Sequence, residues 1–355
     1  MKNECKNLLL RGLHLFFRKR KGQPQSLAQA KVLVISTTAL GDTLWGTAAI
    51  KSFKKSYPNS KIYALSSPVG CKVLENQPEI EEIYLFPNRV FFTIPSLLTK
   101  LRKQKFDAVL LFHASDRLAI FLGASLGAAL VIGTKGLNKG LDSFFTHVIP
   151  WDKTTHEIER RLDMVSYLGA KKQYALTYRT TQEEEEFAEE FLQGKKMVAL
   201  HPGAKDLYKC WPKEKFIELG KLLQKKDIPL LITGVKEEHD LISSIAAALP
   251  GSKYLPAMSL RHFAAILKKM ALVITNDTGP LHLAIAVETP VLALFAPTNS
   301  KICGPYHAKN AQIVQKPATC KPCLRRSCRL PFCMLQISPE EVFRYAEKML
   351  ASANL

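Results

Sequence analysis

The sequence predicts an α/β protein built from two doubly wound domains, each a parallel sheet with helices on both faces. Short apolar runs alternate with helical patterns along nearly the whole chain, which is typical of parallel sheets buried on both sides. The chain has 355 residues, of which 47% are apolar. That length suits two domains rather than one, and that composition is enough to bury two cores.

The first domain is predicted to span residues 31–175, after an N-terminal extension, 1–30. Six apolar runs predict its strands: 31–36, 61–65, 82–86, 107–112, 128–132 and 147–149. Helical patterns between and after them predict helices over 43–57, 94–103, 117–126 and 156–168. A polar stretch, 176–195, is expected to be the linker region, with its acidic run 183–186 in a solvated helix.

The second domain is predicted over residues 196–336, followed by a C-terminal helix in 337–355. Its expected strands are 197–200, 229–233, 253–255, 271–275 and 290–295, and its expected helices are 212–225, 237–249, 260–269 and 280–287. Ser259 is a predicted N-cap. Ser338 and Glu341 form a predicted capping box for the last helix, 339–351.

The net charge of +19 points to an anionic partner: nucleic acid, a membrane surface or a phosphorylated substrate. Nucleic acid is disfavoured, because no binding motif occurs and the basic residues are scattered. Residues 1–22 place their densest charge after the apolar part, unlike a signal peptide. This predicts a cytoplasmic protein whose basic amphipathic N-terminal helix lies on the anionic inner-membrane surface. The alternative is a solvated extension or a helix packed on the domain.

The segment 272–282 is the most informative motif. A buried strand is predicted to end in a tight turn, with a helix starting near Pro280. A helix start leaves about four N–H groups without partners and carries partial positive charge. Thr278 and Gly279 would let an anion approach those groups, so the turn predicts a diphosphate-binding site.

Three further turns follow predicted strands. The first holds Asp42 at a helix start: capping is the simpler interpretation and a general base the other. This first turn has no GxGxxG pattern, which disfavours a dinucleotide cofactor. The second begins at His201, and its Lys209 could reach a phosphate. The third contains Glu237 and Glu238. These could accept hydrogen bonds from ribose, or they could simply be acidic residues that the helix dipole favours in a first turn.

Taken together, these motifs resemble the family-nine glycosyltransferases, the ADP-heptose:lipopolysaccharide heptosyltransferases. The matching residues run in order from about Lys31 to the last helix: Gly41-Asp42, His201-Pro202-Gly203-Ala204 with Lys209 and Trp211-Pro212, Met258-Ser259-Leu260, and Asn276 to His282. The late cysteines look most like the heptosyltransferase II branch.

The resemblance implies a GT-B fold of two Rossmann-like domains, with the acceptor on the first and the donor on the second. It implies inverting, metal-independent transfer of heptose from ADP-heptose to the lipopolysaccharide inner core, with no required cofactor. Asp42 matches the catalytic base, and Lys209 matches the lysine that contacts the donor. The donor residues implied are Gly203, Ala204, Lys209, Glu237 or Glu238, Met258, Asp277, Thr278, Gly279 and His282. Some relatives carry hydroxyl residues at the Gly203-Ala204 position, so here the phosphate would depend more on backbone N–H groups.

The expected acceptor-binding residues are Thr38, Gly41, Arg117, Arg160 and Arg161. An arginine can bind a carboxylate or phosphate through two parallel hydrogen bonds. For each of these three arginines, however, a position on a solvated helix face is the simpler interpretation. The spacing of Cys320, Cys323, Cys328 and Cys333 allows a structural zinc, with reduced buried thiols as the alternative. Two other functions remain open: a GT-B transferase with another nucleotide sugar, and a non-catalytic polyanion or membrane-surface binder.

Overall fold

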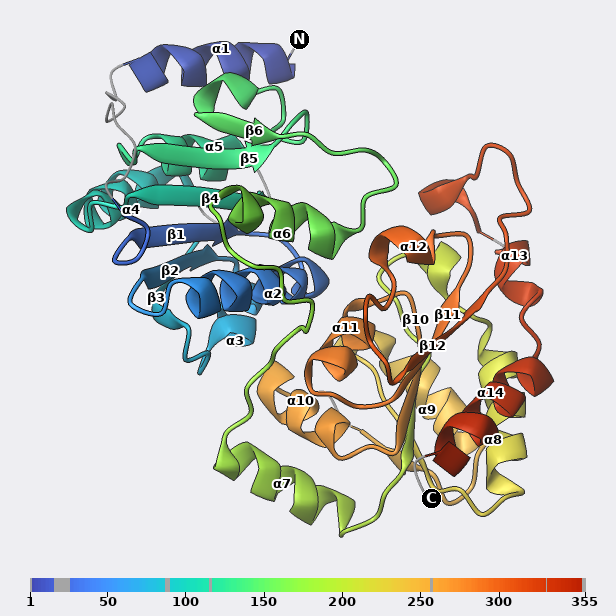
Figure 1. Ribbon diagram of the computed structural model, residues 1–355. Coiled ribbons are helices and arrows are strands. Elements are labelled where there is room, and N and C mark those ends of the chain that lie inside the picture. Colours follow the sequence, from blue (N-terminus) through green and yellow to red (C-terminus); the bar gives the residue numbers. More distant parts are fainter. Residues whose placement is uncertain are drawn as a thin grey trace. The chain divides into compact units, whose positions relative to one another are not determined.

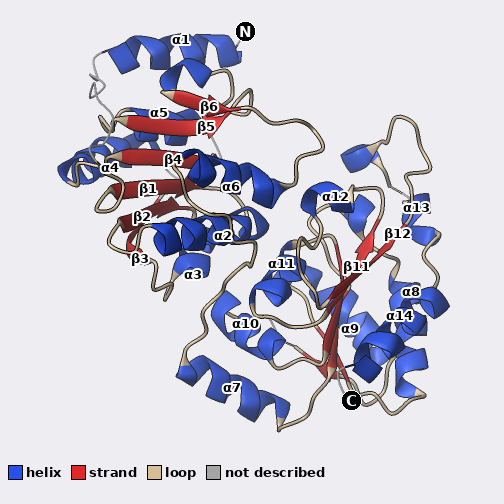
Figure 2. Ribbon diagram, in the orientation of Figure 1, coloured by secondary structure: helices blue, strands red, loops and turns tan. Residues whose placement is uncertain are grey.

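Two parallel sheets of six strands, one in each half of the chain, form the framework of the protein (Figure 1). The computed structural model describes residues 2–15, 26–86, 90–114, 117–255, 258–329 and 331–352. It divides into two units, Met1–Thr177 and Tyr178–Leu355. Helices flank each sheet (Figure 2). The predicted α/β class with two doubly wound units is therefore confirmed.

The first sheet has the strand order β3-β2-β1-β4-β5-β6. Its strands are β1 (Lys31–Ser36), β2 (Lys61–Ser66), β3 (Ile80–Leu85), β4 (Ala108–His113), β5 (Leu130–Thr134) and β6 (His147–Ile149). Every residue of β1 after Lys31 is buried, because helices cover both faces and β2 and β4 pair with its two edges. This explains why β1 is a continuous apolar run rather than an alternating one.

The helices of the first unit form two layers. They are α1 (Lys2–Leu15), α2 (Leu40–Ser56), α3 (Pro68–Leu74), α4 (Val90–Lys103), α5 (Arg117–Ala124) and α6 (Glu157–Tyr167), with a short 3-10 turn, η1 (Asp142–Phe144). α2 packs against α3 and α6, whereas α5 packs against α1 and α4. On the α5 side, Ile35, Val109 and Leu111 of the sheet share a core with Ile120 and Leu122 of α5.

The second sheet repeats this arrangement with the order β12-β11-β10-β7-β8-β9. Its strands are β7 (Val198–His201), β8 (Leu230–Ile232), β9 (Lys253–Tyr254), β10 (Leu272–Asn276), β11 (Val291–Phe295) and β12 (Ala311–Gln315). In each sheet the first strand lies beside the fourth, so the strand order reverses between β1 and β4 and between β7 and β10. Ligands of such sheets bind outside the carboxyl ends of the strands at these switch points.

The helices of the second unit are α7 (Gln182–Leu192), α8 (Lys213–Gln224), α9 (His239–Ala247), α10 (Leu260–Lys268), α11 (Gly279–Ala286), α12 (Ser300–Cys303), α13 (Phe332–Leu335) and α14 (Pro339–Ser352). Three 3-10 turns join them, η2 (Leu207–Lys209), η3 (Lys236–Glu238) and η4 (Arg325–Ser327). α14 packs on α8 and adds Val342, Ala346 and Leu350 to the core.

The predicted N-cap at Ser259 is confirmed, since its hydroxyl accepts from His262 N at 3.1 Å. Of the predicted capping box, the Ser338 hydroxyl accepts from Glu341 N at 3.2 Å, whereas the Glu341 carboxylate pairs with Lys316. The stretch expected as a linker region contains α7, which packs on α10. Its acidic run is only partly solvated, because Glu184 is buried and pairs with Arg261.

Candidate active site

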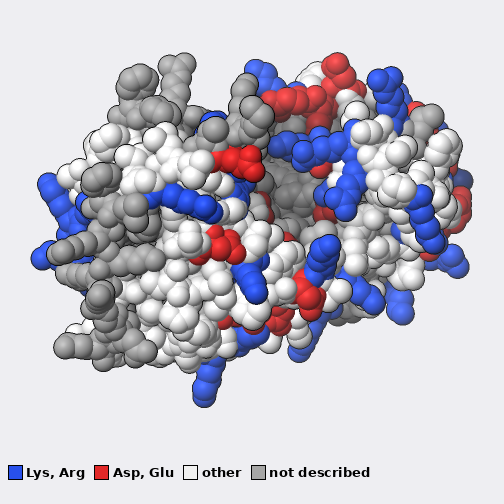
Figure 3. Space-filling model, turned by 90° about the horizontal axis from the view of Figure 1, so that it is seen from above, with Lys and Arg blue, Asp and Glu red and all other residues white. Residues whose placement is uncertain are grey.

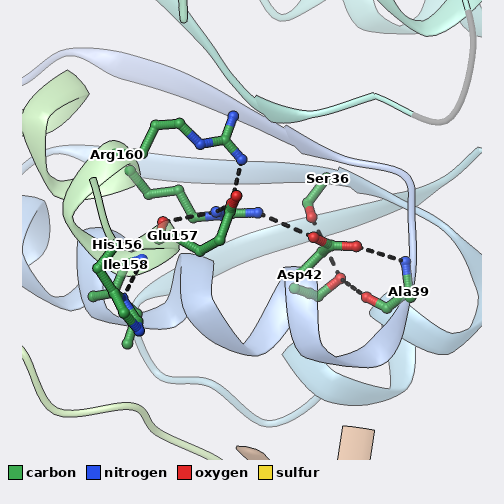
Figure 4. Close-up of polar contacts among 9 residues, drawn as sticks. Ser36, Ala39, Asp42, His156, Glu157, Ile158 and Arg160 are labelled. Carbon is green, nitrogen blue, oxygen red and sulfur yellow. Dashed lines mark hydrogen bonds and ion pairs between the residues drawn. The ribbon is translucent and has the colours of Figure 1, made fainter. Parts of the chain in front are cut away.

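Asp42 lies beside the switch point of the first sheet, on the first turn of α2, which follows β1 (Figure 4). One carboxylate oxygen accepts from Ala39 N at 3.4 Å, which is the expected helix-capping contact. The other oxygen pairs with Arg161 at 3.3 Å. About a fifth of the Asp42 side chain is exposed. The carboxylate is therefore fixed from two sides and still reaches solvent.

Arg160 and Arg161 of α6 are both almost completely buried, so the alternative of a solvated helix face is wrong for them. Glu157, one turn earlier, pairs with both guanidinium groups, and its contact with Arg161 measures 2.7 Å. Burial raises the pKa of Glu157, but the two arginines outweigh it and lower that pKa to about 2. Glu157 therefore stays ionised and holds the arginine pair in place (Figure 4).

Replacing Glu157 by glutamine is expected to lower the free energy of unfolding by about 3–5 kcal/mol, because two buried cations lose their shared partner. A carboxylate with a depressed pKa stabilises the fold above its unfolded pKa and loses that contribution as pH falls through the folded pKa. The difference between the wild type and Glu157→Gln should therefore shrink as pH falls from about 4.5 to about 2. Denaturant unfolding at several pH values measures it; a constant difference would contradict the ion-pair account.

The other expected acceptor residues lie at different places in the first unit. Thr38 follows β1, and its buried hydroxyl has no hydrogen-bond partner among the residues that the structure describes. Gly41 is in the first turn of α2. Arg117 donates from Nε to Asn7 Oδ1 of α1 at 2.7 Å, so it fastens the N-terminal helix.

In the second unit, one buried amide joins two loops at the switch point. Asn276 ends β10 and is completely buried. Its Oδ1 accepts from Trp211 N at 3.1 Å, and its Nδ2 donates to Pro202 O at 2.7 Å. The loop after β7 is thereby tied to the turn that follows β10.

Lys209 and Asp277 form an ion pair of 2.7 Å at this place. Asp277 is 7% exposed and Lys209 21%, so water screens the pair only in part. Burial lowers the pKa of Lys209, but the Asp277 carboxylate outweighs it and the net pKa is raised. The lysine is therefore a cation at neutral pH, held immediately before the first turn of α11.

The turn after Asp277 has the predicted geometry of a helix start. Thr278 is the N-cap of α11, with an extended backbone, and no side-chain capping bond from it occurs in the described structure. The partial positive charge at the start of α11 is therefore available to a bound anion. His282, three residues after Gly279, is buried in α11.

The third turn separates the two candidate acids. Glu238 accepts from Val235 N at 3.0 Å and is partly buried, whereas Glu237 is exposed. Burial raises the pKa of Glu238. A Cβ at position 203 would lie 2.0 Å from the Glu238 carboxyl, so only glycine lets this carboxylate lie against the loop after β7. Ala204 follows in the same loop.

Two further motif residues have distinct surroundings. Met258 directly precedes the N-cap of α10 and is partly exposed. His201 is fully enclosed beside Thr233, with Nδ1 3.0 Å from the hydroxyl, and burial lowers its pKa to about 4. His201 is therefore neutral and serves packing at the end of β7.

The four late cysteines line one small cavity of about 10 Å³. Cys333 is buried and the other three are partly exposed. Nevertheless, no group of three or more His, Cys, Asp or Glu side chains in the described ranges has an arrangement that could hold a metal ion. The residues as placed do not fit the expected zinc site.

The N-terminal helix α1 packs on α5 and is fixed to the loop after β5, where Asn7 donates to Lys139 O and Arg11 to Gly140 O. Leu10 is buried, but Leu8 and Leu9 are 65% and 64% exposed. The basic run Arg18 to Lys21 lies outside the described residues. On the face shown in Figure 3, Lys and Arg side chains stand at many separate points with Asp and Glu between them. None of the helices described has the length and apolar character that a membrane span requires.

Residues 94–333 match the family described as glycosyltransferase family 9 (heptosyltransferase), and the chain belongs to this family. It is 27% identical over 290 residues to lipopolysaccharide heptosyltransferase 3 of Escherichia coli, covering 73% of this chain and 81% of that one. Other relatives are named heptosyltransferase 1 or 2, so the heptosyltransferase II branch stays a prediction.

Solved structures of the family share the fold. The family 9 glycosyl transferase of Veillonella parvula has a TM-score of 0.81 at 21% identity, covering 93% of this chain and all of that one. The ADP-heptose lipopolysaccharide heptosyltransferase II of E. coli has a TM-score of 0.76 at 18% identity, covering 92% and 100%. The GT-B fold is thereby confirmed.

Sequence reasoning missed His113, which ends β4 with a buried Nδ1. It included Asn276 in the matching motif but not the two loop contacts given above. A polar residue at the carboxyl end of a buried strand is a signal that could have identified both.

Proposed function

We propose that this protein is an inverting, metal-independent transferase that moves heptose from ADP-heptose to the inner core of lipopolysaccharide. The observation that carries the proposal is the Lys209–Asp277 pair at the start of α11, at a switch point of a family 9 chain. The names of the relatives support the heptose donor and the lipopolysaccharide acceptor.

On the donor side, negative charge develops on the diphosphate as the bond to the anomeric carbon breaks. The positive end of the α11 dipole, at Thr278 and Gly279, and the Lys209 ammonium are suited to stabilise that charge. Asp277 would position the ammonium. The proposed donor residues around them are Gly203, Ala204, Glu238, Met258, Gly279 and His282.

On the acceptor side, Asp42 would take the proton of the attacking hydroxyl. The hydroxyl oxygen bonds to the anomeric carbon from the face opposite the diphosphate, and the electron pair of the broken C–O bond leaves with ADP. Because the attack comes from the face opposite the leaving group, it inverts the anomeric centre. Arg161 would keep the carboxylate aimed, with Thr38 and Gly41 beside it.

The direct experiment is a thermal-shift screen of ADP-heptose, ADP-glucose, UDP-glucose and UDP-N-acetylglucosamine, followed by product analysis with lipopolysaccharide acceptors. A ligand at 100 times its dissociation constant stabilises a protein by about 2.7 kcal/mol, which is readily seen. Stabilisation by ADP-heptose together with heptose transfer is the expected result. Preference for a UDP-sugar would favour the other GT-B transferase, and salt-sensitive polyanion binding without transfer would favour the non-catalytic binder.

Glu238, rather than Glu237, is proposed to bind the ribose, since only Glu238 lies against the loop that holds Gly203. Replacing Glu238 by alanine is expected to weaken ADP binding about tenfold, because a hydrogen bond to a charged group contributes about 1.5–3 kcal/mol. Calorimetric titration with ADP measures this. Glu237→Ala is the matched control and should bind as the wild type does; equal losses in both variants would remove the assignment.

Attachment to an anionic membrane surface is proposed for α1, whose Leu8 and Leu9 are exposed next to Lys6 and Arg11. It would bring the enzyme to a lipid-linked acceptor.

A structural zinc at the four late cysteines is a separate proposal. The shared cavity supports it, whereas the placement of the thiols does not. Metal analysis after gentle purification decides: about one zinc per chain would support the site, and a metal-free protein would leave reduced thiols.

A further inference from the structure

A small cavity lined by several polar side chains lies at the carboxyl edge of the first sheet. It measures about 50 Å³ and lies at the ends of β4 and β5, between His113, Thr134 and Arg160. One water needs roughly 10–15 Å³ on the same kind of measure, so the cavity admits a small group and not a whole sugar.

Three buried polar atoms of this lining lack partners. His113 Nδ1, Thr134 Oγ1 and Arg160 Nε make no hydrogen bond to any residue that the structure describes. Thr134 and Arg160 are 2% and 3% exposed. Leaving a buried polar group unpaired costs about 1–3 kcal/mol, and such groups deserve an explanation one by one. Three of them around one cavity indicate a ligand.

The character of the lining favours an anion. Arg160 brings a guanidinium that shares Glu157 with Arg161, and Lys139 adds a further ammonium. None of the described lining residues is acidic. Burial lowers the pKa of His113, so its neutral ring can carry a hydrogen on Nδ1, and the Thr134 hydroxyl can donate as well.

Hydrogen bonds within the loop after β5 support one wall of the cavity. Asn138 is buried and donates to Thr134 O at 2.8 Å and to Asp142 Oδ1 at 3.0 Å. The second oxygen of Asp142 accepts from Gly136 N at 2.7 Å. The Asp142 carboxylate is therefore occupied within the loop, and Asn7 of α1 donates to the backbone carbonyl of Lys139.

We propose that this cavity, lined by His113, Thr134, Lys139 and Arg160, binds an acidic group of the acceptor, a phosphate or a carboxylate. The inference rests on the proposed transferase function, because it assigns the ligand to the acceptor. Arg161, next to Arg160, contacts Asp42, so a group held here would place the acceptor beside the proposed base. The cavity would thereby select acidic acceptors.

The test uses Thr134→Val and Lys139→Gln in the full-length chain. Thr134→Val removes an unpaired buried hydroxyl, so its thermal midpoint should be unchanged or higher. Lys135→Gln is the matched control, since Lys135 is exposed on the same loop and does not line the cavity. Binding is measured by calorimetry with deep-rough lipopolysaccharide in detergent, alongside transfer from ADP-heptose.

Both cavity variants are expected to weaken binding of this acceptor on the order of tenfold, with ADP affinity and the control unchanged. Phosphatase-treated and carboxyl-reduced acceptors identify the group that binds. If one treatment abolishes the difference in affinity between wild type and variants, the group removed by that treatment is the ligand of the cavity. Two results would overturn the proposal. One is unchanged acceptor binding in both variants, and the other is a difference between wild type and variants that stays the same with both treated acceptors. Because binding is read without turnover, a wild type that binds this acceptor yet transfers no heptose would refute the proposed function and not the cavity.

Discussion

Replacing Asp42 by asparagine is expected to lower kcat for heptose transfer by about 10²–10⁴-fold, the usual contribution of a general base. Asparagine keeps the size of the side chain, and its oxygen can still accept from Ala39 N or Arg161. It cannot take the proton of the acceptor hydroxyl. ADP affinity should stay unchanged, because the proposed donor residues lie in the second unit.

Initial rates at saturating donor and acceptor measure this effect, with ADP titration as the binding check. Asp163→Asn is a suitable control, since Asp163 of α6 also pairs with a cation, Lys172, at 2.6 Å but is not one of the proposed site residues. A variant Asp42→Asn with near-normal turnover would remove Asp42 from the base role and leave it as a helix cap.

Replacing Lys209 by glutamine is expected to lower kcat by about 10²–10³-fold, which is what removal of one preorganised donor to a developing anion costs. Donor affinity should fall as well, because the lysine would contact the phosphate in the ground state. Lys205→Gln, an exposed lysine of the same loop, should behave as the wild type.

A double variant, Lys209→Gln with Asp277→Asn, separates two explanations of that loss. The single variant leaves the 7% exposed carboxylate of Asp277 without its cation, which could itself repel the donor. If the loss came only from that repulsion, the double variant would recover donor affinity and rate. Persistent loss in the double variant is expected if Lys209 contacts the phosphate.

Much of the fold was predictable because the strands are buried on both faces and short turns separate them. Residues 31–36 and 147–149 were predicted with the bounds that the structure has. The missed elements carry weak local signals. α3 has seven residues and contains Gly70, and β12 is an edge strand in which only Val314 is buried. Short helices and half-exposed edges lack the periodicity on which such predictions depend.

The candidate site was predictable only as a set of positions. Asp42, Lys209 and Asp277 follow from turns after buried strands and from the family resemblance. Their partners do not, since Arg161 lies 119 residues from Asp42 and Asn276 lies 74 from Pro202. The choice between Glu237 and Glu238 likewise depends on which side chain turns toward Gly203, and adjacent residues look equal in sequence.

Asp277 supplies Lys209 with a counter-ion from the protein itself. A bare phosphate ion that approaches this lysine meets a charge that is already neutralised, and it must compete with a partly desolvated carboxylate at 2.7 Å. A ligand gains enough only by making further contacts, such as ribose with Glu238 and phosphate with the helix start. We therefore expect the pair to discriminate a nucleoside diphosphate from the abundant inorganic phosphate of the cell, which would otherwise act as an inhibitor.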